Sequence, residues 1–394
     1  MTALARPLRS GIIGTGFMGS VHAAAVRAAG GTVTRVASRS KAGAEQALAR
    51  LGGAAAAESP KALIESDDVD VVHICTPNAA HAELANLAIA AGKSVICEKP
   101  LATTAKDAAA LYAEANRAGV VNAVPFVYRF YPAVREARAR LQAGEAGPLW
   151  LLHGSYLQDW LADPGASNWR VDPTIGGGSR AFGDIGVHWC DLMEFVTGHR
   201  IERLVAQTAL AFSERPQTGL DSPRTTTAVG TEDGATVMFE TNQGAIGSLL
   251  VSQVSPGRKN RLWFSFEGPD ATFSFNQERP DSLWVGGNTY SRTISSGSDS
   301  LSTEQGKRYA VLPAGHPQGY QDSFNSFVAD VYAAVRGAAP DGLPDFRDGL
   351  RAAHITEAVL ESAATGRWVD VPGRDHQSSP LYGSGAAPIL ERKS

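Results

Sequence analysis

Two separate segments of the sequence carry side chains that together could move a proton. Lys99 follows an apolar run that ends at Cys97, and Pro100 comes directly after it. A lysine at a strand end can direct its ammonium across a ligand site, although a lone lysine is more often a surface residue. Asp184 precedes His188 by four residues, which places both on one face of a helix. Because an imidazole can accept a proton near neutral pH, we predict a proton-transfer site.

The residues around this aspartate and histidine bear on their role. Three consecutive glycines at 176–178 precede Asp184 and would let the backbone come close to a substrate. Asp191 lies one turn beyond His188. The competing interpretation is a structural pair in which the histidine only bonds the carboxylate four residues before it. The spacing alone leaves both interpretations open.

A glycine-rich turn near the start of the chain indicates a dinucleotide site. It follows an apolar run and consists of Gly14, Thr15, Gly16, Phe17, Met18 and Gly19. In a strand–turn–helix unit the first glycine forms the tight turn, the second lets a pyrophosphate approach, and the third allows close packing. The free N–H groups at the helix start then bind phosphate. A glycine turn without a ligand is the alternative, and the strand–helix context argues against it.

The end of the second predicted strand bears on the choice of nicotinamide cofactor. An NAD site usually has an acidic residue about 20 residues beyond the glycines, where this chain has Ser38, Arg39 and Ser40. Arg39 can pair with a 2′-phosphate and Ser38 can donate to it, which favours NADP. An arginine that only stacks on the adenine would not distinguish NADP from NAD.

Six residues follow the next two predicted strands and are expected at the same edge of the sheet: Thr76, Pro77, Asn78, His81, Glu98 and Lys99. Open α/β sheets bind their ligands outside the carboxyl ends of the strands. We therefore predict that these residues contact the cofactor.

The first third of the chain alternates short β-branched runs with alanine-rich stretches of helical length. The runs that fit strands lie at 11–13, 33–37, 69–75, 94–97 and 120–124, and the helical stretches at 20–29, 42–51, 81–91 and 104–118. This alternation predicts an α/β Rossmann domain over residues 1–128, with a parallel sheet covered on both faces. Four glycines are expected to end its helices: Gly30, Gly52, Gly92 and Gly119.

After Pro132 predicted strands follow one another directly, so we expect a second, α+β domain over 129–372. An antiparallel meander is predicted from strands at 225–230, 235–241, 245–254, 261–267 and 271–275. A helix at 320–336 has one apolar face and is expected to pack on that sheet. A further helix is expected at 346–366, irregular structure at 286–315, and a tail at 373–394.

The composition excludes several classes of protein. The chain has 394 residues, of which 43% are hydrophobic and 19% charged, as in a globular protein of about two domains. Its net charge of −4 does not favour nucleic acid or an anionic membrane as a partner, and no apolar run approaches the ~18 residues that span a bilayer. Cys75, Cys97 and Cys190 lack the spacing of a disulfide framework or zinc site, so no metal is expected. Without an apolar secretory segment at the start, we predict a cytoplasmic protein.

In combination, these motifs resemble the Gfo/Idh/MocA family of oxidoreductases over nearly the whole chain. The resemblance is carried by the glycine turn, Thr76–His81, Glu98–Pro100 and Asp184–Asp191. It implies a Rossmann domain followed by a large open antiparallel sheet, with the last helix returning to the Rossmann side. It also implies that Lys99, Asp184 and His188 form the catalytic group, that the Lys–Pro bond is often cis, and that subunits form dimers or tetramers through the open sheet.

Within that resemblance, the stretches 155–160, 168–170 and 316–320 are similar to those of bacterial sugar dehydrogenases. Aromatic faces beside amide and guanidinium groups suit a sugar, and the expected substrate contacts are Lys99, Gln158, Arg170, Asp184 and His188. Trp160 and Trp169 fit a sugar site and an interdomain core equally well.

The implied reaction is oxidation of a secondary hydroxyl of a sugar or cyclitol, such as a pyranoside or the anhydrosugar levoglucosan, with NAD or NADP. Those sugar dehydrogenases favour NAD whereas Arg39 favours NADP, so the cofactor stays open. One alternative is an NADPH-dependent keto-sugar reductase acting on a substrate such as 1,5-anhydrofructose. A less favoured alternative is a non-catalytic sensor of dinucleotide and sugar, which the presence of Lys99 and His188 argues against.

Overall fold

A computed structural model describes residues 6–216 and 226–373. Its N-terminal part is a six-stranded sheet in the order β3-β2-β1-β4-β5-β6, and every pairing in it is parallel. Its strands are β1 (Arg9–Ile13), β2 (Thr32–Ala37), β3 (Ala55–Ala56), β4 (Val71–Ile74), β5 (Ser94–Cys97) and β6 (Asn122–Ala123). The strand order reverses between β1 and β4, where a Rossmann fold binds its ligand. The predicted Rossmann architecture is confirmed.

Helices connect these strands: α1 (Phe17–Ala28), α2 (Lys41–Leu51), α3 (Pro60–Ile64), α4 (His81–Ala90) and α5 (Ala105–Ala118). Local signals set their ends. Ser40 and Thr104 accept a backbone hydrogen bond at the start of α2 and α5, as N-cap residues do. Gly52 and Gly119 end the same helices with φ of 66°, a left-handed conformation that glycine adopts without a steric penalty. The predicted helix-ending glycines are thus confirmed for α2 and α5.

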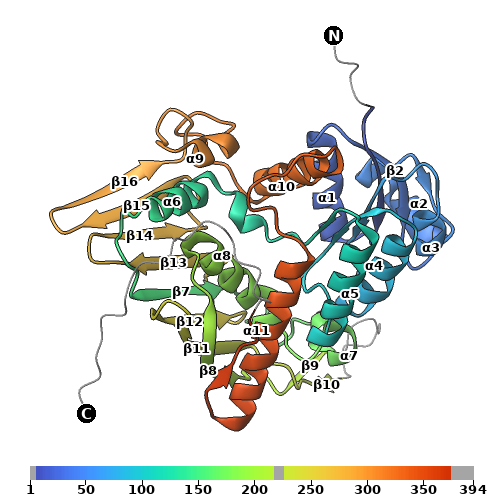
Figure 1. Cartoon of the computed structure of the whole chain (residues 1–394). Helices are drawn as coiled ribbons and strands as arrows, with labels where there is room; N and C mark the ends of the chain where they lie inside the picture. Colours follow the sequence, from blue (N-terminus) through green and yellow to red (C-terminus); the bar gives the residue numbers. More distant parts are fainter. Residues whose placement is uncertain (1–5, 217–225, 374–394) are drawn as a thin grey trace.

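The second part of the chain builds a nine-stranded sheet in the order β16-β15-β14-β13-β7-β12-β11-β8-β17. The strands are β7 (Leu151–Leu157), β8 (Ile201–Ala209), β11 (Gly234–Thr241), β12 (Ile246–Ser252), β13 (Arg261–Glu267), β14 (Ala271–Asn276), β15 (Ser282–Gly287), β16 (Tyr290–Ser295) and β17 (Val369–Asp370). Helices cover one face of this sheet (Figure 1): α6 (Pro132–Gln142), α8 (Val187–Thr197) and α11 (Phe346–Thr365). The predicted large open sheet is confirmed.

The predicted meander is wrong at its centre. β7, from earlier in the chain, lies between β12 and β13 and pairs in parallel with β12. Adjacency in the sequence favours neighbouring strands but does not exclude a non-local strand that buries its apolar residues there. The strand predicted at 225–230 is β10 (Thr226–Ala228), which pairs with β9 (Glu214–Pro216) in a separate small sheet. Residue 225 lies outside the described residues.

Two further expectations need correction. The segment 286–315 is not irregular, because it contains β16 and the helix α9 (Glu304–Tyr309). The helix expected at 320–336 is α10 (Tyr320–Val335), and it packs on α1 instead of the large sheet (Figure 1). Its apolar face was correctly identified, but a helical period does not specify which surface that face covers. Phe324, Phe327 and Val331 fill the Rossmann core beside Val21 and Val26.

α11 contacts both α5 of the Rossmann domain and β8 of the large sheet, so the last helix does return to the Rossmann side. Short turns complete the described fold: η1 (Asn78–Ala80), η2 (Val127–Phe130), η3 (Trp169–Val171), α7 (Pro173–Gly176) and the π-helical η4 (Phe182–Gly186). No helix in the described ranges is long and apolar enough to cross a membrane. The tail predicted from 373 lies, after its first residue, outside the described residues, and the domain limits 1–128 and 129–372 stay predictions.

Candidate active site

A cavity of about 1300 Å³ extends along the carboxyl edge of the parallel sheet to the large-sheet domain. Of the residues predicted for the site, all but Gly19 line it: Gly14, Gly16, Phe17, Met18, Ser38, Arg39, Thr76, Pro77, Asn78, His81, Glu98, Lys99, Gln158, Arg170, Asp184 and His188. The predicted residues that share this space lie up to 174 positions apart in the sequence (Gly14 and His188).

The glycine turn has the geometry that a dinucleotide requires. Gly14 has a φ of +108°, and a Cβ there would lie 2.4 Å from the carbonyl oxygen of Cys75. A Cβ on Gly19 would lie 2.2 Å from the carbonyl oxygen of Gly14, whereas one on Gly16 would meet nothing within 4 Å. α1 begins after Gly16 without a side-chain cap, so its first N–H groups are free for an anion. These residues fit a bound dinucleotide, with the pyrophosphate at Gly16.

One cationic side chain at the end of β2 is available to bind a phosphate. Ser38 Oγ donates to the carbonyl of Ser40 at 2.7 Å, and Ser40 Oγ accepts from Gly43 N at 3.2 Å to cap α2. Arg39 is exposed and lines the cavity, and within the described part of the chain it has no hydrogen bond or ion pair. The serines hold the turn, so a 2′-phosphate would rely mainly on Arg39.

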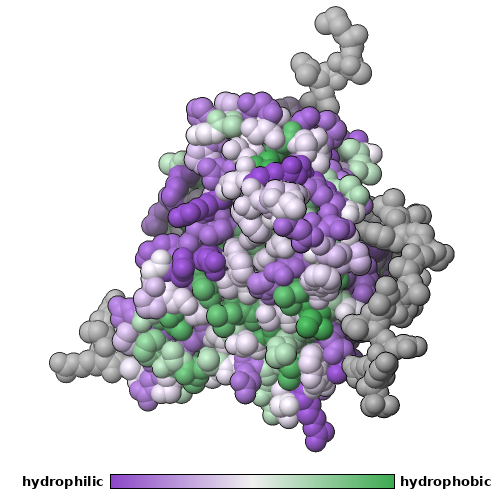
Figure 2. Space-filling view, turned by 90° about the vertical axis from the view of Figure 1, so that its left-hand side faces the viewer, coloured by the Kyte–Doolittle hydropathy of each residue, from purple (hydrophilic) through white to green (hydrophobic). Residues whose placement is uncertain are grey.

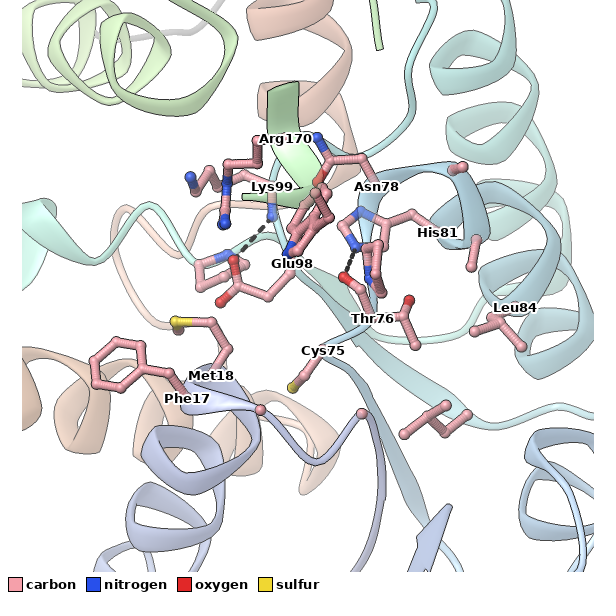
Figure 3. Close-up of a pocket in the computed structure, with 18 of the residues that line it drawn as sticks. Phe17, Met18, Cys75, Thr76, Asn78, His81, Leu84, Glu98, Lys99 and Arg170 are labelled. Carbon is pink, nitrogen blue, oxygen red and sulfur yellow. Dashed lines mark hydrogen bonds between the residues drawn. The ribbon is translucent and has the colours of Figure 1, made fainter. Parts of the chain in front are cut away.

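The loop after β4 joins the two domains. Asn78 Nδ2 donates to the carbonyl of Gly176 at 2.7 Å. His81 is fully buried and contacts two carbonyls, Thr76 O at 2.9 Å from Nε2 and Pro100 O at 2.7 Å from Nδ1 (Figure 3). Burial lowers the pKa of His81, and a neutral ring donates to only one of these carbonyls at a time. His81 thus braces two strand-end loops beneath the cavity.

Lys99 and Asp184 meet in the middle of the cavity. Lys99 Nζ donates to Asp184 Oδ1 at 2.6 Å and to the carbonyl of Asp184 at 2.8 Å. Both side chains are largely buried, at 12% and 14% exposure, and the Lys99–Pro100 bond is cis. An ammonium has three N–H groups. One therefore remains for a ligand oxygen.

Asp184 is held by two further donors. Arg170 Nε donates to Oδ1 at 3.2 Å, and Gln253 Nε2 donates to Oδ2 at 2.8 Å. Burial raises the pKa of Asp184, but the charges of Arg170 and Lys99 outweigh it, so the pKa lies well below its ordinary value. Gln253 is fully buried just after β12 and was missed by the sequence analysis, since no motif marks it. The site thus contains a fixed, ionised carboxylate.

His188 lies beside this group without bonding to it. The helix expected around Asp184 and His188 opens with the π-helical turn η4, and in the described chain Asp184 makes no hydrogen bond to His188. The imidazole packs edge-on against Phe126 and Tyr128, and its Nδ1 is buried without a partner there. Burial, with the charge of Lys99, lowers the pKa of His188 well below its ordinary value. A neutral ring therefore faces the cavity through Nε2.

Two features of the sequence near this helix lie outside the cavity. Asp191 does not line the cavity; its carboxylate accepts from Arg129 Nε at 2.8 Å in a buried ion pair. The glycines at 176–178 do not line it either. A Cβ on Gly176 would lie 2.8 Å from the carbonyl oxygen of Arg170, so this glycine permits close packing of chain segments. The expected approach to a substrate is wrong.

A hydrogen-bonded wall borders the cavity beside His188. Asn260 Oδ1 accepts from Gln158 Nε2 and from Tyr156 OH, both at 2.7 Å, and Tyr128 OH bonds to Tyr156 OH. Tyr128, Tyr156 and Asn260 line the cavity but were not among the predicted site residues. The aromatic stretch 155–160 could have indicated Tyr156, whereas Asn260 sits in an ordinary turn before β13.

Trp169 and Trp160, which the sequence left open between a sugar site and an interdomain core, differ in their position relative to the cavity. Trp169 lines the cavity, and the Arg170 guanidinium lies 4.3 Å from its ring centroid. Trp160 does not line it and donates to Gln158 Oε1 at 2.9 Å. From the stretch 316–320, Tyr320 reaches the cavity. Among the described residues, no group of His, Cys, Asp or Glu side chains is arranged to hold a metal.

Comparisons with known proteins give the family. The model described as "Oxidoreductase family, NAD-binding Rossmann fold" matches residues 8–126, and the "GFO/IDH/MocA C-terminal domain" matches residues 134–274. The chain belongs to the Gfo/Idh/MocA family. It is accordingly an oxidoreductase with an NAD-binding Rossmann fold, and the predicted family resemblance is confirmed.

Two relatives within the Gfo/Idh/MocA family are named for reactions of sugars. The levoglucosan dehydrogenase of Pseudarthrobacter phenanthrenivorans is 32% identical over 396 residues, covering 93% of this chain and 98% of that protein. A structure of levoglucosan dehydrogenase with NADH and L-sorbose superposes with a TM-score of 0.86 at 32% identity, over 93% of this chain and 100% of that one. The 1,5-anhydro-D-fructose reductase of Ensifer adhaerens is 35% identical over 176 residues, 44% of this chain and 51% of that protein.

Proposed function

We propose that this chain is an NAD(P)-dependent dehydrogenase that oxidises a secondary hydroxyl of a sugar or cyclitol. A pyranoside or an anhydrosugar such as levoglucosan is the proposed substrate. The observation that carries the proposal is the convergence of Lys99, Asp184 and His188 in the cavity that also contains the glycine turn. The similarity to levoglucosan dehydrogenase over the whole chain supports it.

Each of the three residues has a distinct role in the proposed reaction. When bound, the nicotinamide supplies the hydride acceptor. His188, kept neutral by burial, takes the hydroxyl proton at Nε2. The remaining N–H of Lys99 stabilises the negative charge that develops on the substrate oxygen. Asp184 fixes the ammonium through Oδ1 and its carbonyl and remains ionised.

The substrate would lie between this trio and the wall of Tyr128, Tyr156, Asn260 and Gln158. The wall presents hydroxyl and amide groups that can bond the non-reacting hydroxyls of a sugar. Trp169 presents an aromatic ring to the same space. Such a site holds the reacting carbon near the nicotinamide, which lowers the entropic part of the barrier.

A keto-sugar reductase is the second candidate, because the same residues would catalyse the reverse reaction. Lys99 would polarise the carbonyl and His188 would return the proton. The exposed Arg39 at the end of β2 favours this candidate, since it can pair with the 2′-phosphate of NADPH. So does the similarity to a 1,5-anhydro-D-fructose reductase over 44% of the chain.

One activity screen tests both candidates. The purified chain is incubated with NAD⁺ or NADP⁺ and a panel of pyranoses, anhydrosugars and inositols, and with NADH or NADPH and the corresponding keto-sugars. Absorbance of reduced nicotinamide is followed. Turnover of at least one sugar, abolished in the double variant Lys99→Ala/His188→Ala, supports the proposal. Dinucleotide binding without turnover of any compound would instead support the sensor.

We also propose that the uncovered face of the large sheet joins two copies of the chain. Met238, Ile246 and Leu250 are 48–59% exposed there, on the paired strands β11 and β12. Figure 2 shows apolar residues gathered on the lower half of this side of the molecule. Light scattering should give a dimer or tetramer that Ile246→Lys weakens; a monomer at every concentration would contradict it.

A further inference from the structure

Five side chains form a continuous hydrogen-bonded chain through the Rossmann core, and its last member is Glu98. Glu98 Oε1 lies 3.0 Å from His22 Nε2, and His22 Nδ1 lies 3.0 Å from His73 Nδ1. His73 Nε2 lies 3.2 Å from Ser10 Oγ, which lies 2.6 Å from Tyr332 OH. The members come from β1, α1, β4, the end of β5 and α10. None of them except Glu98 lines the cavity.

The hydrogen-bonded chain of side chains is buried throughout. Ser10, His22, His73 and Tyr332 have no exposed surface, and Glu98 is 5% exposed. Polar groups in such a place cost free energy unless every one is bonded, and apolar side chains of similar volume would pack there at lower cost. The rest of this core is apolar. The presence of this hydrogen-bonded chain therefore requires an explanation other than the stability of the folded protein.

Counting protons fixes the direction of the hydrogen bonds. In one arrangement Tyr332 donates to Ser10, Ser10 to His73 Nε2, His73 Nδ1 to His22 Nδ1, and His22 Nε2 to Glu98. Every donor and acceptor is then used, and both imidazoles are neutral. Any reversed arrangement leaves the hydroxyl proton of Tyr332 without an acceptor in the described part of the chain. Burial lowers the pKa of His73 well below its ordinary value, which agrees with a neutral ring.

In this arrangement Glu98 accepts from His22 and needs no proton of its own. Burial raises the pKa of Glu98, but the hydrogen bond from His22 and the positive charges of neighbouring groups, Lys99 among them, together outweigh burial, so the pKa is lowered. Glu98 Oε2 accepts the backbone N–H of Lys99 at 3.2 Å, while the ammonium of that lysine points to Asp184. His81, a further titratable neighbour, has a lowered pKa and bonds to carbonyls. Glu98 is thus a buried anion supported by a chain of dipoles that all point toward it.

Glu98 faces the part of the cavity where a nicotinamide would lie. With the pyrophosphate at Gly16 and the adenosine toward Arg39, the other half of a dinucleotide extends past β4 to the end of β5. Figure 3 shows Glu98 in that position, between Lys99 on one side and Met18 on the other. The reacting trio borders the same space.

We propose that Glu98, oriented by His22 and the chain behind it, makes the site bind the oxidised dinucleotide preferentially over the reduced one. This inference rests on the proposed function. The oxidised nicotinamide ring carries a positive charge that disappears when it accepts a hydride, so a fixed anion at this place stabilises only the oxidised form. Glu98 then favours binding of the oxidised dinucleotide and release of the reduced one, and it lowers the reduction potential of the bound couple.

The test measures the dissociation constants of NADH and NAD⁺, by reduced-nicotinamide fluorescence and by competition. Glu98→Gln keeps the shape and the acceptor for His22 but removes the charge. We expect it to weaken NAD⁺ binding about tenfold more than NADH binding, which corresponds to about 30 mV in the potential of a bound two-electron couple. If the cavity prefers the phosphorylated dinucleotide, NADP⁺ and NADPH are used in the same way.

Three further variants of the protein are measured alongside Glu98→Gln. His22→Leu removes the donor to Glu98 and should shift the ratio in the same direction, which keeps the test available should Glu98→Gln fail to fold. His22→Gln can both donate to Glu98 and accept from His73, so its ratio should stay within about threefold of wild type. Tyr332→Phe breaks one buried hydrogen bond at the far end, where Ser10 still donates to His73, and should lower the unfolding temperature without changing the ratio.

Two results would overturn the inference. If Glu98→Gln weakens both forms equally, the carboxylate only contacts a part common to both, such as the ribose. If Tyr332→Phe shifts the ratio as much as Glu98→Gln, the effect is structural. A wild-type protein that binds neither form would instead overturn the proposed function, and the inference with it.

Discussion

The two ends of the cavity are built in different ways. At the cofactor end, short contiguous segments follow successive parallel strands, and the glycine turn acts through its backbone. At the substrate end, single side chains come from separate elements: Lys99 after β5, Asp184 in η4, Gln253 after β12 and Asn260 before β13. Lys99 and Gln253 donate to Asp184, and Asn260 accepts from Gln158. The first end is local in sequence, whereas the second exists only once both domains have packed. Substitutions at the two ends should therefore affect different measurements.

The largest effect is expected at the substrate end. Lys99→Ala should lower kcat by ~10²–10⁴-fold, because it removes the charge that stabilises the substrate oxygen and one of the two cations paired with Asp184. The dissociation constant of NADH should change by less than about fivefold, since the glycine turn is untouched. Steady-state kinetics and fluorescence titration check both values. Lys307→Ala, on α9 outside the cavity, is the matched control, and an equal loss in both would contradict the assignment.

At the cofactor end, Gly16→Val is expected to weaken dinucleotide binding. A Cβ at this position would meet no atom within 4 Å apart from the adjacent residues, so the fold should be unaffected while the space for a pyrophosphate is filled. NADH affinity should fall by more than about 30-fold at an unchanged unfolding temperature. Gly14→Ala is the contrasting variant, because its Cβ would clash with Cys75 and should cost ~1–3 kcal/mol of stability. Identical behaviour of the two variants would refute the distinction between open and packed glycines.

Substitutions of Gln253 distinguish a role in positioning Asp184 from a role in packing. Gln253→Leu should lower kcat by about tenfold, because one oxygen of Asp184 loses its donor in a buried site. Gln253→Glu should be poor at neutral pH and recover as the pH falls, since only a protonated glutamate can donate to Asp184. A pH series of kcat with both variants is the measurement. Gln243→Leu, an exposed turn residue, should have no effect, and a pH-independent Gln253→Glu would show that packing alone matters.

At the end of the cavity where the adenosine is expected, Arg39→Asp tests the preference between NADP⁺ and NAD⁺. The substitution replaces Arg39, which has no partner among the described residues, with an anion that repels a 2′-phosphate and can bond a 2′-hydroxyl. The KM ratio of NADP⁺ to NAD⁺ should rise by about tenfold or more. Ser38→Ala, which removes a hydroxyl already bonded to the chain, should change the ratio little. Equal changes of both constants in Arg39→Asp would show that the arginine only stacks on the adenine.

The smallest expected effect is on the acid side of the pH profile. The pKa of His188 lies well below the ordinary value of 6.5 because burial and Lys99 disfavour its charged form. A lowered histidine pKa keeps the neutral base available at lower pH, so kcat/KM in the direction of oxidation should stay flat as the pH falls through 6.5. A limb with an apparent pKa at the ordinary value, lost in His188→Gln, would contradict this environment.

The difference between the two ends also explains what could be predicted from the sequence. The glycine turn, the strand-end residues and most Rossmann elements follow from local patterns, in which Gly14 and Gly19 satisfy backbone constraints that no other residue meets. The large sheet was predicted as a class, but the insertion of β7 between β12 and β13 is a long-range pairing. The partner of α10 could not be read from its apolar face for the same reason.

At the candidate site, Lys99, Asp184 and His188 were predicted because their motifs are short and distinctive. Gln253 and Asn260 carry no such mark, since each is one amide in a turn or at a strand end, and only the folded chain brings them to Asp184 and Gln158. The π-helical turn before His188 was likewise not predictable from spacing, as i and i+4 positions imply an ordinary helix.

The central claim is that a substrate C–H bond is placed against the nicotinamide at the site of Lys99, Asp184 and His188. Its most direct test uses the sugar with the highest rate in the screen, deuterated at its ring carbons, and mass spectrometry of the reduced dinucleotide. The account predicts that one deuterium is transferred to the nicotinamide, and that neither Lys99→Ala nor His188→Ala forms the labelled product at a comparable rate. A reduced dinucleotide without deuterium, or full transfer in both variants, would contradict it.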